Sequence, residues 1–111
     1  MAGITTHVLD TARGRPAAGV PVTLEIQGDG GAFSLVGRGV TDADGRYREL
    51  TRDHAMQRAT YRITFDTSAY FGAAAHFYPK VAIEFVVTEP GEHFHVPLLV
   101  SPFGFSTYRG S

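Results

Sequence analysis

The chain has 111 residues, a hydrophobic fraction of 43%, an aromatic fraction of 12% and a formal net charge of -1. These values describe one folded domain, residues 1–111, and exclude a disordered chain. The near-neutral charge provides no basic surface for nucleic acid or for an anionic membrane, so we expect neither partner. Cysteine is absent, which excludes disulfides, thiolate nucleophiles and cysteine-based zinc sites.

Alternation of apolar and polar residues, the period of a half-buried β-strand, dominates the chain. It begins in residues 5–10, T-T-H-V-L-D, where His7 lies on a strand beside Thr5 and Leu9. It recurs over residues 20–27, 61–66 and 81–87. The residues predicted to face inward are Val20, Val22, Leu24 and Ile26, then Tyr61, Ile63 and Phe65, and then Val81, Ile83, Phe85 and Val87.

Glycine-containing turns at residues 28–31, 42–45 and 89–92 separate these strands. Residues 33–41 predict a further strand, loosened by Gly37 and Gly39. Only residues 51–58, T-R-D-H-A-M-Q-R, have a helical pattern, with Thr51 as the N-cap and Asp53 in the first turn. Many short strands with one short helix predict an antiparallel β-sandwich.

The last predicted strand, H-F-H-V-P-L-L-V-S-P over residues 93–102, has two unequal faces. One face is apolar, with Phe94, Val96, Leu98 and Val100. The other combines His93, His95, Pro97 and Leu99. A face that is partly apolar and partly titratable predicts contact with a partner or a pocket. Pro97 predicts an edge position or a bulge.

His7, Arg46 and His95 are the candidate catalytic residues. A neutral imidazole accepts a proton near pH 7, and a guanidinium stabilises negative charge that develops on a carbonyl oxygen. Together they suffice to activate water against an electron-poor amide without a metal or a covalent nucleophile. The alternative is a metal site formed by His7, His93 and His95, but the sequence places no acidic residue to support such ligands, and we expect no metal.

Five segments resemble 5-hydroxyisourate hydrolases, the transthyretin-related enzymes of purine catabolism. They are T-T-H-V-L-D-T (5–11), D-G-R (44–46), Y-R-I-T-F-D-T-S-A-Y-F (61–71), F-Y-P-K-V (77–81) and H-V-P-L-L-V-S-P-F-G-F-S-T-Y-R-G-S (95–111). The most specific is the terminal Y-R-G-S, which separates the hydrolases from the transthyretin hormone carriers. Phe105 departs from the family, which more often has tyrosine there.

The resemblance implies an all-β, transthyretin-like sandwich of two four-stranded sheets with one short helix. It also implies a homotetramer with active sites at the dimer–dimer interface. The implied reaction is hydrolysis of 5-hydroxyisourate, the product of urate oxidation, to 2-oxo-4-hydroxy-4-carboxy-5-ureidoimidazoline, with no cofactor.

Residue by residue, the family's catalytic histidine of the first strand matches His7, its turn arginine matches Arg46, and the histidine before V-P-L-L matches His95. Its C-terminal tetrapeptide matches Tyr108, Arg109, Gly110 and Ser111. The hypothesis is that His7, Arg46, His95 and Ser111 are catalytic, and that these four bind substrate together with Tyr108, Arg109 and Gly110. Which histidine is the general base stays open.

Two alternatives remain at this stage. A carrier that binds a small molecule in a central channel predicts apolar residues where the histidines stand. A structural sandwich without activity has no need of the polar trio. The N-terminal residues lack the basic and then apolar pattern of a signal peptide, and no apolar stretch has the length of a membrane span, so we expect a cytoplasmic protein.

Overall fold

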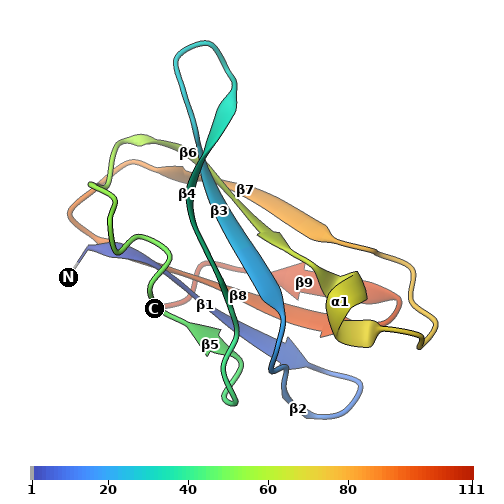
Figure 1. The fold of residues 1–111 in the computed structure, drawn as a ribbon. Helices are drawn as coiled ribbons and strands as arrows, with labels where there is room; N and C mark the ends of the chain where they lie inside the picture. Colours follow the sequence, from blue (N-terminus) through green and yellow to red (C-terminus); the bar gives the residue numbers. More distant parts are fainter. Residues whose placement is uncertain (1) are drawn as a thin grey trace.

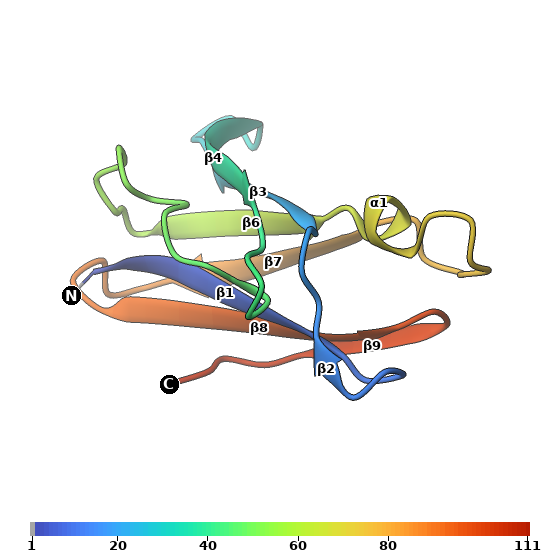
Figure 2. The same ribbon diagram turned by 60° about the horizontal axis from the view of Figure 1, so that its bottom comes forward.

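The computed structural model describes residues 2–111 and shows two β-sheets packed face to face, with a short helix at one end (Figure 1). The first sheet has the order β2-β1-β8-β9, and β5 also pairs with β1. The second has the order β4-β3-β6-β7. The two layers are seen edge-on in Figure 2.

The strands of the first sheet are β1 (Gly3–Asp10), β2 (Arg15–Pro16), β5 (Arg46–Tyr47), β8 (His93–Ser101) and β9 (Gly104–Thr107). Those of the second are β3 (Pro21–Gln27), β4 (Phe33–Val40), β6 (Ala59–Phe65) and β7 (Val81–Val87). Strands β1 and β8 run parallel, and every other strand pair in residues 2–111 is antiparallel. The predicted β-sandwich is confirmed. Its first sheet reaches five strands because β2 and β5, of two residues each, both pair with β1.

The core lies between the sheets. It contains the predicted inward residues of β6, namely Tyr61, Ile63 and Phe65, all fully buried. Opposite them, Ile4 and Val8 of β1 are buried as well. Burying an apolar side chain of this kind contributes about 1.5–3 kcal/mol to stability, so the inner faces fix which residues point outward. The alternate residues of β1 and β8 are therefore directed away from the core.

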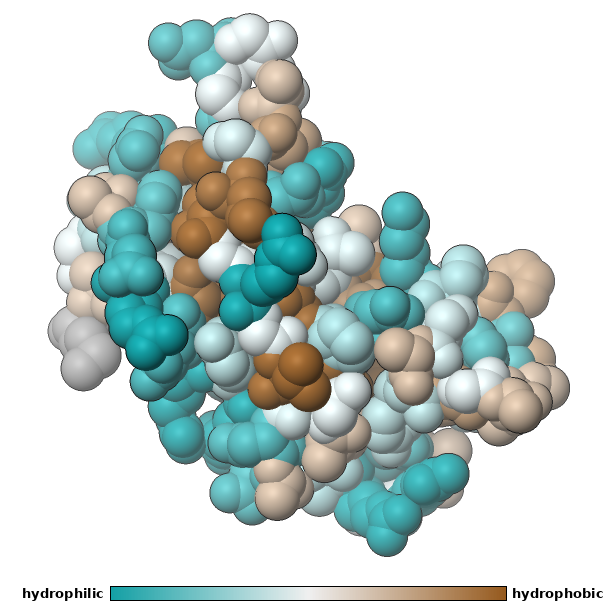
Figure 3. Space-filling view, in the orientation of Figure 1, coloured by the Kyte–Doolittle hydropathy of each residue, from teal (hydrophilic) through white to brown (hydrophobic). Residues whose placement is uncertain are grey.

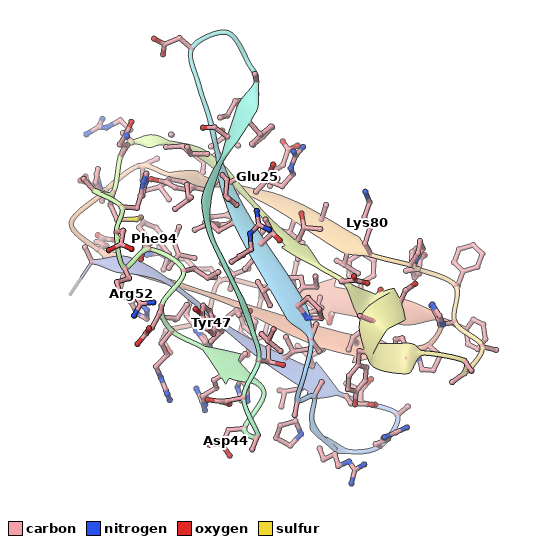
Figure 4. The ribbon with its side chains drawn as sticks, in the orientation of Figure 1. Glu25, Asp44, Tyr47, Arg52, Lys80 and Phe94 are labelled. Carbon is pink, nitrogen blue, oxygen red and sulfur yellow. The ribbon has the colours of Figure 1, made fainter. Side chains whose placement is uncertain are left out.

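Gly37 and Gly39 of β4 permit close packing rather than merely loosening the strand. A Cβ on Gly37 would lie 2.1 Å from the carbonyl oxygen of Leu50, and one on Gly39 would lie 2.1 Å from the ring of Tyr47. Figure 4 shows Tyr47 between β4 and β5. Hydrophobic residues gather over β4 in the space-filling view of Figure 3. Leu35 and Val40 of this strand are exposed.

We expect Gly37→Ala to lower the free energy of unfolding by about 1–3 kcal/mol, because the obstructing atom belongs to the backbone and cannot rotate away. Urea unfolding of the variant and of the parent protein measures this difference. Gly30→Ala is the matched control, since a Cβ there meets nothing within 4 Å. A Gly37→Ala protein as stable as the Gly30→Ala protein would contradict the packing described here.

The helix prediction for residues 51–58 is wrong. That segment forms turns and irregular chain, and the helix is α1, Thr67–Phe71, with Asp66 as its N-cap. Thr51 does not cap a helix: its hydroxyl accepts a hydrogen bond from the backbone N–H of Ile4 (3.3 Å). Tertiary contacts override the local helix preference of the segment.

Tyr61 holds the same segment from its other end. The Tyr61 hydroxyl lies 2.8 Å from Nε2 of His54 and accepts from the backbone N–H of Gln57 (3.0 Å).

The five residues of α1 are too few to show helical periodicity in the sequence. No helix within residues 2–111 combines the length and apolar character needed to cross a membrane.

The edge position predicted from Pro97 is also wrong. Strand β8 lies inside its sheet, between β1 and β9. Pairing with β9 begins at Leu98, one residue after Pro97, and the register with β1 continues through Pro97 without a bulge. The proline therefore interrupts no β8–β9 pair, and its carbonyl accepts a hydrogen bond from the Thr107 hydroxyl (2.7 Å).

Candidate active site

The register of the first sheet brings the three candidate catalytic residues together. His7 on β1 is paired with Arg46 on β5, and Thr5, two residues earlier, is paired with His95 on β8. Paired residues point to the same side of a sheet, and the alternate residues of β1, Ile4 and Thr6, are buried on the inner side. His7, Arg46 and His95 therefore share the outer face, although 88 residues separate the two histidines in sequence.

A pocket of about 290 Å³ opens on this face. Its lining contains three of the predicted site residues, Arg46, His95 and Ser111, together with His93, which the sequence places on the same strand face as His95. Thr5, Arg48 and Thr51 also line it and were not among the predicted site residues. His7 lies on the same face but outside the lining. The walls thus combine two guanidinium groups with two imidazoles, a setting suited to a polar substrate.

The turn before β5 fixes the position of Arg46. One carboxylate oxygen of Asp42 accepts hydrogen bonds from the backbone N–H groups of Asp44 (2.9 Å) and Arg46 (3.0 Å). Asp44 lies at the tip of this turn (Figure 4). Gly45 has a φ of 75°, and a Cβ there would lie 2.4 Å from the carbonyl oxygen of Val8. The turn D-A-D-G therefore anchors Arg46 beside β1.

The ring of His95 is held from two sides. Its Nδ1 lies 2.9 Å from the hydroxyl of Thr5, which also lies 2.8 Å from Nε2 of His93. On the other side, Gly110 donates its backbone N–H to the His95 carbonyl (2.8 Å). A Cβ on Gly110 would lie 2.6 Å from Cδ2 of the His95 ring, so only glycine packs here without displacing the ring.

Partial burial lowers the pKa of His95, and the nearby His7, His93, Arg46 and Arg48 lower it further. Burial removes water that would solvate the imidazolium, and the neighbouring cations repel it. His95 is therefore neutral near pH 7. A neutral imidazole beside a guanidinium can accept a proton while the guanidinium stabilises an oxyanion.

The C-terminal tetrapeptide divides between two places. Gly110 and Ser111 reach the His95 pocket, whereas Tyr108 and Arg109 line a separate cavity of about 330 Å³ between β7 and β8. The Arg109 guanidinium donates to Glu92 (3.0 Å) and lies 4.5 Å from the ring centre of Phe94. Within one chain, the structure does not bring Tyr108 and Arg109 to the trio.

Two of the unpredicted lining residues have a signal in the sequence. Thr5 stands two residues before His7, and Arg48 two residues after Arg46, so each shares the face of its neighbour if the strand continues. Thr51 has no such signal, because it lies in a loop and not on a strand. Within residues 2–111, no group of three or more His, Asp or Glu side chains is arranged to hold a metal ion.

The fold and the site together define a transthyretin-like β-sandwich with a polar pocket on the outer face of one sheet. Residues 4–110 match the HIUase/Transthyretin family, and the chain belongs to that family. Among solved structures, it resembles Klebsiella pneumoniae 5-hydroxyisourate hydrolase, with a TM-score of 0.86, 36% identity and 100% of both chains covered. It also resembles transthyretin from Sparus aurata, with a TM-score of 0.91, 27% identity, and 99% of this chain and 97% of that chain covered.

Curated relatives are similar over the whole chain. The 5-hydroxyisourate hydrolase of Caulobacter vibrioides is 44% identical, with 100% of each chain covered. The uric acid degradation bifunctional protein TTL of Arabidopsis thaliana is 52% identical over 97% of this chain, and this chain spans only 37% of that protein. The resemblance stated from the sequence is confirmed.

Proposed function

We propose that this chain, as a single hydrolase domain over residues 1–111, hydrolyses 5-hydroxyisourate to 2-oxo-4-hydroxy-4-carboxy-5-ureidoimidazoline in urate degradation. The observation that carries the proposal is the meeting of His7, Arg46 and His95 on one sheet face beside a pocket. The hydrolases among the relatives support the choice of substrate.

In the proposed mechanism, His95 is the general base. It lines the pocket with Arg46, and its lowered pKa keeps its imidazole ready to accept a proton. A water oxygen attacks the ring carbonyl while its proton moves to His95, and Arg46 stabilises the oxyanion. The carbon–nitrogen bond then breaks, and the leaving nitrogen takes a proton from His7. The proton that His95 accepted returns to His7 through solvent, so both imidazoles end as they began. Ser111 contacts the substrate from the pocket wall.

The proposal also includes a homotetramer with active sites at the dimer–dimer interface, a cytoplasmic location and no cofactor. Tyr108 and Arg109 face away from the trio of their own chain. In the proposed tetramer they contact substrate across the interface. Sedimentation equilibrium tests the assembly, and four chain masses are expected.

The direct test is kinetic. 5-Hydroxyisourate is made in situ from urate with urate oxidase, and its ultraviolet absorbance is followed with and without this protein. We expect decay faster than the spontaneous rate, and the same rate after treatment with EDTA. No acceleration over spontaneous decay would exclude the proposed activity.

We expect the acidic limb of the kcat/KM profile, which reports the free enzyme, to lie below pH 6.5, the ordinary imidazole value, because the base form of His95 persists to lower pH when its pKa is lowered. Arg48→Ala removes one of the cations that lower this pKa, so the limb should move to higher pH. Arg48→Lys, which keeps the charge, is the matched control. A limb that stays in place in Arg48→Ala would contradict the electrostatic account.

A carrier function is the remaining alternative, because the fold also matches sea bream transthyretin solved in complex with thyroxine, with a TM-score of 0.89 and 28% identity. A carrier needs an apolar binding surface. The pocket wall here carries Arg46, Arg48, His93 and His95 instead, which favours a catalytic site over the binding site of a carrier.

A further inference from the structure

The hydroxyl of Thr5 lies between two imidazole rings. Its oxygen is 2.9 Å from Nδ1 of His95 and 2.8 Å from Nε2 of His93, both within hydrogen-bond distance. Thr5 lines the same pocket as both rings. Nδ1 of His95 therefore has a hydrogen-bond partner in Thr5. Nε2, the other nitrogen of the same ring, has none among the described residues 2–111.

The single proton of the Thr5 hydroxyl couples the tautomers of the two rings. A threonine hydroxyl has one proton to donate, so it can donate to only one of the two ring nitrogens. The other ring must carry its own N–H and donate to Oγ1. The tautomer of His95 therefore depends on the direction in which Thr5 donates.

The charged groups around His95 favour one direction. Those that face it are His7 from β1, His93 from β8, and Arg46 and Arg48 from β5 and the chain that follows it. Guanidinium groups are donors only and cannot accept a hydrogen bond. Among these donors, a lone pair on Nε2 of His95 is more favourable than an N–H at the same atom. His93 is exposed, so solvent can accept from the N–H on its Nδ1.

We propose that Thr5 is a positioning residue for hydrolysis: its hydroxyl donates to Nε2 of His93 and accepts from Nδ1–H of His95, which leaves Nε2 of His95 as the proton acceptor in the site. Its effect on turnover rests on the proposed function, whereas the tautomer does not. The Nε2–H tautomer is the more stable one of a free neutral histidine side chain. Thr5 therefore holds neutral His95 in the less stable Nδ1–H form. This form leaves Nε2 free to accept a proton, as the general base must.

The kinetic test compares Thr5→Val with Thr5→Ser. Valine keeps the shape and removes the hydroxyl, so we expect kcat to fall about 10- to 100-fold with KM little changed, by analogy with the loss of groups that orient metal-ligating histidines. Serine keeps the hydroxyl and should retain most of the activity. Thr23→Val, the same change on β3 in the other sheet, is the matched control and should leave kcat unchanged. Wild-type kcat in Thr5→Val would overturn the proposal.

The second readout is independent of the reaction. Nitrogen-15 NMR of the histidine rings at about pH 7.5, above the ordinary imidazole pKa, reports which nitrogen carries the proton. The His95 signals are assigned by their loss in His95→Gln. We expect Nδ1–H in the wild type and in Thr5→Ser, and a shift to Nε2–H in Thr5→Val.

A wild-type His95 in the Nε2–H form, or an unchanged His95 spectrum in Thr5→Val, would overturn the proposed role of Thr5. If the wild-type protein does not accelerate 5-hydroxyisourate decay, the proposed function fails, and the spectra still decide whether Thr5 sets the tautomer. The two failures are therefore distinguishable.

Discussion

Replacing His95 with alanine should lower kcat for 5-hydroxyisourate hydrolysis by roughly 10²–10⁴-fold, the contribution of a positioned general base. The ring lines the pocket, its pKa is lowered, and Thr5 and Gly110 hold it in place. Initial rates of absorbance loss, corrected for spontaneous decay, measure the effect.

His76→Ala is the matched control for this experiment. His76 bonds to Ser68 of α1 (2.9 Å) and packs on Phe71, and it does not line the pocket. The control should keep wild-type kcat. A His95→Ala protein that turns over as fast as the control would remove His95 from the mechanism.

Arg46→Ala should lower kcat by roughly 10²–10³-fold, the loss associated with one oxyanion donor. Arg46→Lys should recover only part of this loss, because an ammonium keeps the charge but lacks the planar fork of the guanidinium. Arg58→Ala, which removes an exposed arginine outside the pocket, is the control. Arg46→Ala with an unchanged kcat would show that the oxyanion is stabilised elsewhere.

Neither substitution should unfold the protein. His95 and Arg46 point away from the core, which is formed by the inner faces of both sheets. Because neither side chain fills that core, neither substitution leaves a cavity in it. Urea unfolding of each variant separates a loss of chemistry from a loss of structure.

Periodicity predicted the strands because one face of each is buried. The alternation of Tyr61, Ile63 and Phe65 with polar residues follows directly from the sandwich core. The helix could not be placed in this way. Residues 51–58 are held by Tyr61 and Ile4, contacts that local propensity does not contain, and α1 is too short for a period.

The site was only partly predictable for a similar reason. Residue chemistry and the family resemblance single out His7, Arg46 and His95, but their meeting depends on the parallel pairing of β1 with β8 across most of the chain. No local pattern specifies that pairing. The same holds for Thr51, which a loop brings to the pocket, and for Arg109, which the fold turns toward Phe94.

The measurement that tests the central claim most directly compares the wild-type protein with the double variant His7→Ala/His95→Ala at equal concentration in the 5-hydroxyisourate decay assay. The wild type should accelerate decay, and the double variant, folded to the same stability, should leave it at the spontaneous rate. A double variant that hydrolyses the substrate as fast as the wild type would show that the face shared by β1, β5 and β8 is not the active site.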